Sequence, residues 1–282
     1  MGSALTEVVV ALFDKIVWQI ETSLSETITL EQLSEKCAIS KYHMCRAFQQ
    51  GAGISIMTYV RARRLSMAAR TIADSEEAII GIAIDAGYAS HEAFTRAFAG
   101  YFGVLPSTVR VAHFYSMLCL MEPIKMKKEM IVDVPKPDMR EREAFRVVGL
   151  SINCSFEDTS AVPRLWQSFN SREGDVDGAK GGAAYGVCCD ADETGRFRYL
   201  AGVEARGKTE GMDHVDVPAG RYAVFEHNGH VSDLPKTVYT IWNKSLPDLG
   251  LEPAKVPDFE RYDNRFDPAS GRGTVEIWIP IS

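Results

Sequence analysis

The sequence contains no apolar run long enough to cross a lipid bilayer, which argues against a membrane-spanning protein. A spanning helix needs about 20 consecutive apolar residues, and no stretch approaches that length. The first residues, MGSALTEVVVALFDK, have no basic segment and no small-residue cleavage site before their apolar stretch, so they do not resemble a secretory signal. We therefore expect a cytoplasmic protein without a membrane partner.

Sequence signatures of metal sites, dinucleotide sites and a nucleophile elbow are also missing. The six cysteines form no CxxC pair and have no spacing typical of a disulfide scaffold, so we expect reduced thiols. The histidines add no metal-ligand spacing to them. The absence of GxGxxG and GxSxG removes the signals for a dinucleotide fold and a nucleophile elbow. We predict no cofactor, no metal and no catalytic residue.

An excess of positive charge is missing as well. The formal net charge is −7, of which residues 1–115 contribute −1 and residues 116–282 contribute −6. Strong nonspecific binders of nucleic acid usually carry a basic face, because neutralising phosphates releases counterions. Any contact with DNA must therefore depend on where single charges are placed.

The pattern of apolar residues divides the chain into a helical part, 1–115, a linker, 116–137, and an α+β part, 138–282. Helical spacing of apolar residues predicts a short helix that follows Thr29 and holds Leu30 and Leu33, and helices over 8–20, 41–50, 54–73, 77–86, 90–102 and 107–112. Thr29 with Gln32 has the spacing of a capping box. Later segments alternate and predict strands over 145–152, 183–189, 197–203, 221–227 and 274–279, with helices over 162–170 and 234–245. This order suggests a β-α-β-β unit that occurs twice.

The helical part also repeats itself. SKYHMCRAFQQGAGISIMTYV aligns with SHEAFTRAFAGYFGVLPSTVR at an offset of 50 residues. The identical pairs are Ser40/Ser90, Arg46/Arg96, Ala47/Ala97, Phe48/Phe98, Gly53/Gly103 and Thr58/Thr108. One supersecondary unit therefore occurs twice, joined by a long helix.

Each copy has the pattern of a helix-turn-helix, whose second helix buries one face and offers the other to the major groove. The buried faces are expected to hold Met44, Ala47 and Phe48 in the first copy and Phe94, Ala97, Phe98 and Phe102 in the second. The outward faces are expected to hold Tyr42, Cys45, Arg46 and Gln49, and His91, Glu92, Thr95 and Arg96. Arg pairs with guanine and Gln with adenine. An amphipathic helix with a solvated face would explain one copy, but two copies favour DNA reading.

Four motifs, SKYHMCRAF, YVRARRLSMAARTI, IAIDAGYASHEAFTRAF and FGVLPSTVR, resemble the AraC/XylS family of transcription regulators over residues 8–112. The resemblance implies tandem, homeodomain-like helix-turn-helix units that read adjacent major-groove segments. It makes residues 42, 45 and 46 and residues 91, 92, 95 and 96 base-facing, although Tyr42 and Cys45 depart from close relatives. Together with the cap and phosphate positions, the candidate DNA contacts are Ser40, Lys41, Tyr42, Cys45, Arg46, Gln49, Arg61, Ser90, His91, Glu92, Thr95 and Arg96.

The linker helix between the copies carries Arg61, Arg63 and Arg64. We expect at least one of them to contact a phosphate and one to pair with Asp85 or Glu35. A purely structural role for all three is an equally open reading.

The last strand, VEIWIPI, places Glu276 and Trp278 on one face and Val275, Ile277 and Ile279 on the other. If helices cover the apolar face, a carboxylate and an indole remain over a concave surface. Such a pair suits an apolar cation, through charge attraction and cation–π contact. Rim packing by Trp278 and a solvated Glu276 are the competing explanation.

Residues 138–282 resemble the GyrI-like, effector-binding domain of multidrug-binding regulators, through VPAGRYAVFEHNG, PDFERYDNRF and VEIWIPI. With an AraC-type part first, the whole chain resembles the Rob-type arrangement. The resemblance implies a groove between two pseudo-symmetric halves, with a glutamate at its base that meets cationic or amphipathic ligands. We assign that role first to Glu276 and second to Glu260, with walls formed by Tyr185, Phe225, Trp242, Tyr262 and Trp278.

Sequence reasoning thus predicts a regulator that is not an enzyme, with double-stranded DNA and a small effector as partners and RNA polymerase as a further candidate. Two alternatives stay open for the second domain. It could be a small-molecule hydrolase, in which Glu276 acts with Tyr262 or Tyr185, or it could be a protein-binding module.

Overall fold

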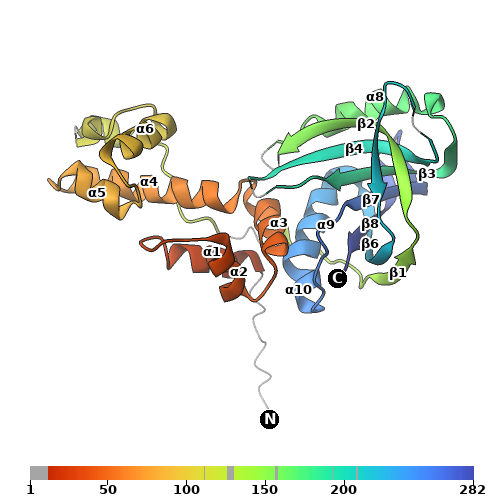
Figure 1. Ribbon diagram of the computed structural model, residues 1–282, viewed down its shortest axis with the longest axis horizontal. Coiled ribbons are helices and arrows are strands. Elements are labelled where there is room, and N and C mark those ends of the chain that lie inside the picture. Colours follow the sequence, from red (N-terminus) through yellow and green to blue (C-terminus); the bar gives the residue numbers. More distant parts are fainter. Residues whose placement is uncertain (1–11, 111, 126–129, 156–157, 193, 208) are drawn as a thin grey trace, which may run out of the picture. The chain divides into compact units, whose positions relative to one another are not determined.

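The computed structural model describes residues 12–110, 112–125, 130–155, 158–192, 194–207 and 209–282 (Figure 1). The described chain forms two compact units, which are not the two halves of the sequence. One unit contains residues 14–41 and 55–125; the other contains residues 12–13, 42–54 and those from 130 to 282. Residues 42–54 therefore belong, by their contacts, with the C-terminal part of the chain.

The first of these units is helical, as predicted. Its helices are most of α1 (Leu12–Glu21), then α2 (Leu30–Cys37), α4 (Ile56–Asp74), α5 (Ile79–Asp85), α6 (His91–Phe102), η1 (Pro106–Arg110) and α7 (Ala112–Tyr115). The predicted start of the first helix at residue 8 lies outside the described residues. The capping box is confirmed: the Thr29 hydroxyl accepts from the Gln32 amide, and the Gln32 side chain accepts from the Thr29 amide. These bonds satisfy amides that a helix start leaves without partners.

The core of the second helix-turn-helix lies where α4, α5 and α6 meet. Phe94 and Phe98 of α6 pack with Leu65 of α4 and Ile82 of α5, and all four side chains are buried. Because α6 buries only this stripe, its other side stays free for contacts outside the protein.

The linker helix is held by an ion pair that the sequence did not indicate. Arg63 donates two hydrogen bonds of 2.8 Å to the two carboxylate oxygens of Glu21, and a third to the carbonyl of Met121. The partner predicted for one of these arginines was Asp85 or Glu35; for Arg63 it is Glu21. The reason is tertiary, because the fold brings Glu21, the last residue of α1, within hydrogen-bond distance of Arg63.

The other unit is built on one antiparallel sheet of eight strands (Figure 1). The strands are β1 (Asp138–Arg142), β2 (Phe145–Ser155), β3 (Ala179–Cys189), β4 (Arg196–Ala205), β5 (Asp213–Val217), β6 (Gly220–His230), β7 (Asp258–Asp267) and β8 (Arg272–Pro280). Their order is β1-β6-β8-β7-β3-β4-β2-β5. All five predicted strands are present; β1, β5 and β7 were not predicted.

The predicted duplication is visible in the element order. One repeat is β2, α8 (Val162–Asn170), β3 and β4; the other is β6, α9 (Leu234–Thr240), β7 and β8. The helix predicted over 234–245 continues after α9 as the π-helical turn η5 (Ile241–Ser245), followed by α10 (Leu246–Asp248). In the sheet, β7 of one repeat pairs with β3 of the other. This pair of strands is the seam between the two repeats.

Strand register separates the two faces of the sheet. Phe225, Ile277, Glu260, Gly186 and Ala201 are successive cross-strand partners, so their side chains share one face. Ala201 packs with Leu165 and Phe169 of α8, which identifies this as the helix-covered face. The opposite face has its own aromatic core, including Phe145, Tyr185, Tyr222, Phe259 and Trp278.

Candidate functional site

Helix α6 presents the outward face that the sequence predicts. Its N-cap is Ser90, whose hydroxyl accepts a 3.1 Å hydrogen bond from the Ala93 amide. His91, Glu92 and Arg96 are exposed, and Thr95 is partly buried. Hydrogen bonds from its own amide and from Ser90 lower the pKa of Glu92, so its carboxylate is ionised and can only accept hydrogen bonds.

Helix α3 (Lys41–Ala52) has the same length as α6 and lies 50 residues earlier, as the repeat predicts. Its side chains are nevertheless placed differently. Seven consecutive residues, 43–49, are buried. In this structure Cys45, Arg46 and Gln49 are therefore buried, whereas the sequence predicts them on the outward face, and Tyr42 is half-buried. The physical reason is that α3 packs within the same compact unit as the C-terminal part of the chain.

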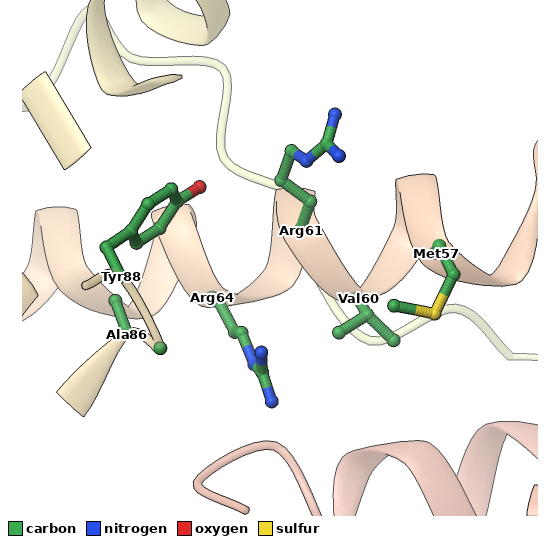
Figure 2. Close-up of a pocket in the computed structure, with 7 residues that line it drawn as sticks. Met57, Val60, Arg61, Arg64, Ala86 and Tyr88 are labelled. Carbon is green, nitrogen blue, oxygen red and sulfur yellow. The ribbon is translucent and has the colours of Figure 1, made fainter. Parts of the chain in front are cut away.

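Two arginines of the linker helix leave α4 in opposite directions beside a small depression of about 190 Å³ (Figure 2). Arg61 is exposed. Arg64 instead donates to the backbone carbonyls of Leu24 and Glu26. Of the three linker arginines, Arg61 alone is therefore directed at solvent, while Arg63 and Arg64 hold the fold together.

The seam of the sheet carries a cluster of one carboxylate and three aromatic side chains. Tyr199 of β4 and Tyr262 of β7 each donate a 2.8 Å hydrogen bond to Oε2 of Glu260. Trp166 of α8 donates from Nε1 to the Tyr199 hydroxyl at 3.1 Å, and its ring packs edge-on against Tyr262 with centroids 5.0 Å apart. Trp166, Glu260 and Tyr262 are all partly exposed, so the cluster is reachable from outside.

A glycine makes this cluster possible. Tyr199 and Glu260 lie on β4 and β7, on either side of β3, and must meet over the backbone of Gly186. A Cβ atom at this position would lie 2.0 Å from the Tyr199 hydroxyl oxygen and 2.8 Å from Oε2 of Glu260. Only a residue without a side chain leaves room for the two groups to bond.

The electrostatics of Glu260 favour a cationic guest. Removal of water by the surrounding protein raises its pKa, and the hydrogen bonds from Tyr199 and Tyr262 offset this only in part. Both bonded groups are neutral phenols, and burial raises their own pKa values well above the usual range. An incompletely compensated carboxylate beside aromatic rings attracts a positive charge.

Glu276, the first choice from the sequence, is in a different position. It lies on the opposite face of the sheet, where Arg140, Arg261, Arg265 and the Trp278 indole all donate to its carboxylate. Burial alone would raise its pKa, but these donors lower it. Its charge is thus already compensated by this chain's own cations, and a ligand cation would gain little there.

The wall residues named from the sequence do not form one site. Tyr262 lies beside Glu260, whereas Tyr185 and Trp278 belong to the opposite face. Phe225 is buried on the helix-covered face, and Trp242 is fully buried in η5. The sequence analysis missed Tyr199 and Trp166, because the register of β4 against β3 places Tyr199 at the seam and the packing of α8 against the sheet places Trp166 there. The alternation of Asp258, Glu260 and Tyr262 was a readable signal for that strand.

Replacing Gly186 by Ala is expected to displace the Tyr199 hydroxyl from Glu260, because the added methyl occupies its place. Overpacking of this kind costs about 1–3 kcal/mol of unfolding free energy. Gly181→Ala is the matched control on the same strand, since nothing lies within 4 Å of its added Cβ. Denaturant titration of both variants tests this, and equal stabilities would contradict the close approach.

Two negative findings concern the described residues. None of the described helices combines the length and the apolar character needed to cross a membrane. Within the same ranges, no group of three or more His, Cys, Asp or Glu side chains is arranged to hold a metal ion.

Comparison with known proteins gives two family matches. Residues 135–282 match the GyrI-like small molecule binding domain, and residues 33–112 match a helix-turn-helix domain. The transcriptional regulator Rob of Salmonella typhimurium is 25% identical over 287 residues, covering 95% of this chain and 96% of Rob. The multiple antibiotic resistance protein MarA of the same organism is 32% identical over 105 residues, covering 37% of this chain and 83% of MarA.

Two further likenesses cover about half of this chain. The transcriptional regulator BrlR of Pseudomonas aeruginosa is 36% identical over 146 residues, which span 50% of this chain and 53% of BrlR. The solved structure of SAV2435 bound to tetraphenylphosphonium is similar to 52% of this chain and 94% of that chain. Its identity is 17% and its TM-score 0.46, too low to assign a ligand.

Proposed function

Because this chain belongs to the family of GyrI-like small molecule binding domains and carries an AraC-type helix-turn-helix region, we propose that it is a ligand-responsive transcriptional regulator. It reads specific DNA sequences with its helix-turn-helix units and binds a small cationic or amphipathic effector with its C-terminal part. The observation that carries the effector assignment is the Glu260 carboxylate, bonded to two neutral phenols at the seam of the two repeats.

The proposed DNA contacts of the second unit are Ser90, His91, Glu92, Thr95 and Arg96. The exposed face of α6, opposite the buried Phe94 and Phe98, supports them. Arg96 suits a bidentate contact to guanine, and the ionised Glu92 can accept from a cytosine amino group. Arg61, exposed on α4, is the proposed phosphate contact of the linker helix. For the first unit the proposed contacts remain Ser40, Lys41, Tyr42, Cys45, Arg46 and Gln49.

Arg96→Ala is expected to weaken specific DNA binding by about 1–3 kcal/mol, because a base contact is lost. Selection of duplexes from a random pool with the full chain identifies the DNA sequence that it binds. A gel shift with that duplex at fixed salt then measures the affinity of each variant. Arg172→Ala, at a partly exposed arginine of the other unit, is the control. If the two variants bind the enriched duplex equally well, Arg96 does not read a base.

We propose that the effector is bound without turnover, so that the protein is not an enzyme. Hydrolysis by Glu276 with Tyr262 or Tyr185 finds no support, because the Glu276 carboxylate is engaged by three arginines and Tyr262 is on the other face. Incubation of the full chain with lipophilic cations, followed by mass spectrometry, tests this directly. Product formation that Glu260→Gln abolishes would show catalysis instead of binding.

RNA polymerase is a further proposed partner, since a DNA-bound regulator acts on transcription through the enzyme or its access to the promoter. Transcription in vitro from a promoter that contains an enriched duplex tests this step. A change in transcript level that requires Arg96 is the expected result.

A further inference from the structure

Helix α3 is buried more completely than a DNA-reading helix should be. An amphipathic recognition helix should bury one stripe, but α3 buries residues 43–49 without interruption. A helix that is buried on all sides is an interior element. Here the stripe that would read DNA, which contains Cys45, Arg46 and Gln49, is the stripe turned inward.

An arginine at the centre of α3 makes the principal contact. Arg46 is 2% exposed and donates hydrogen bonds of 2.8 and 2.9 Å to the two carboxylate oxygens of Asp258. Its guanidinium lies 4.9 Å from the centre of the Trp242 ring. A buried guanidinium requires such a partner, because an uncompensated charge away from water is strongly unfavourable. Asp258 and Trp242 thus form a site that fits this arginine.

Further contacts of α3 are specific in the same way. Asn243 donates from Nδ2 to the Ala47 carbonyl at 3.1 Å, and a ring nitrogen of His43 lies 3.1 Å from the Trp242 carbonyl. Phe48 stacks on Phe13, which packs edge-on against Tyr239 of α9. A network of directed polar and aromatic contacts indicates a defined docked state.

The docking site is continuous with the proposed effector site. Asp258 and Glu260 are alternate residues of β7, so their side chains lie on the same face at the seam. The two carboxyls and the guanidinium influence one another: proximity to Asp258 raises the pKa of Glu260, and proximity to Arg46 lowers it. Arg46 is therefore a positive charge close enough to influence the site where a cationic effector would bind.

We propose that α3 is an autoinhibitory element, and that a lipophilic cation at Glu260 releases it by repelling Arg46 from Asp258. In the docked state the first recognition helix cannot enter a major groove, while α6 remains exposed for the second segment. Coupling is reciprocal, so DNA that captures α3 also favours binding of the cation. This inference rests on the proposed function, in which α3 reads DNA and Glu260 binds a cation.

Asp258→Asn in the full chain tests the docking without any effector, because it removes the charge that holds Arg46 and keeps the side-chain shape. We expect amide hydrogen exchange in residues 43–49 to accelerate at least about tenfold, within the range typical of coupling between sites. Asp216→Asn, at an exposed aspartate of β5 that pairs with Arg146 of β2, is the matched control and should leave exchange in α3 unchanged. Slow exchange of α3 in a folded Asp258→Asn protein would overturn the proposal.

Two further measurements separate this inference from the function on which it rests. Footprinting on enriched duplexes should show one protected major-groove segment for the wild type and two, about 34 Å apart, for Asp258→Asn. Wild-type protein that protects both segments without a cation overturns autoinhibition. Tetraphenylphosphonium, as the probe cation, should accelerate exchange in residues 43–49 of the wild type. If it binds and α3 stays protected, the coupling is wrong; if it does not bind, the effector assignment fails while the Asp258→Asn result still decides docking.

Discussion

Glu260→Gln should reduce the affinity of the full chain for tetraphenylphosphonium by at least about tenfold. The substitution keeps the size of the side chain and removes the negative charge, and an interaction with a charged group typically contributes about 1.5–3 kcal/mol. Isothermal titration calorimetry measures the effect. Glu276→Gln is the matched control: its charge is shared among Arg140, Arg261 and Arg265, so its loss should leave cation affinity within about twofold. The reverse ranking would return the site to Glu276.

The same assignment predicts a dependence on pH. Burial raises the pKa of Glu260 above its ordinary value, and the ionised form is the one that attracts a cation. Affinity for tetraphenylphosphonium, whose own charge does not titrate, should therefore fall as pH decreases through this raised pKa. The midpoint should lie above about 4.3, the value of an unperturbed glutamate. The facing groups Tyr199 and Tyr262 stay protonated there, because burial raises their pKa values further. A neutral analogue should bind equally across the range.

Arg63→Ala is expected to lower the free energy of unfolding of the helical unit by about 3 kcal/mol. It removes the guanidinium that donates to both oxygens of Glu21 and to the Met121 carbonyl, and it leaves a half-buried carboxylate with only the Tyr59 hydroxyl as donor. Breaking a buried pair from one side costs this much because the remaining charge is uncompensated. Arg61→Ala, two residues away and exposed, should change stability by less than about 0.5 kcal/mol.

Denaturant titration followed by circular dichroism measures both variants, with the helical unit and the sheet unit fitted as separate transitions. The pair also predicts acid sensitivity. Burial alone would raise the pKa of Glu21, but hydrogen bonds from Arg63 and Tyr59 lower it. A lowered carboxyl pKa contributes stability above the unfolded pKa, and this is lost as pH falls through the folded pKa. Equal loss of stability in the Arg61 and Arg63 variants would mean that the ion pair is not what holds α1 to α4.

Local features of the structure follow from the sequence because they depend on near neighbours. The capping box of Thr29 and Gln32 needs only four residues. The repeat at an offset of 50 anticipates two helices of equal length, each followed by a glycine at φ 74°, Gly53 and Gly103. Period-two alternation likewise anticipates five of the strands and the order of the two β-α-β-β repeats.

The pairing of the strands and the docking of α3 cannot be predicted from such short-range patterns. In the sequence, Glu276 and Glu260 are both carboxylates with aromatic residues nearby. The register of β7, β3 and β4 decides that Glu260 bonds to phenols and Glu276 to arginines. Likewise, Arg46 and Arg96 occupy the same slot of two aligned helices, yet one is buried against Asp258 and the other is exposed.

Periodicity, capping and repetition thus determine which helices and strands form, because they act through bonds and side chains a few residues apart. The tertiary structure alone decided which charged side chains form ion pairs. A salt bridge such as Arg46–Asp258 joins residues 212 positions apart, and the free energy of a charge depends on the water and the counter-charge around it in the folded state.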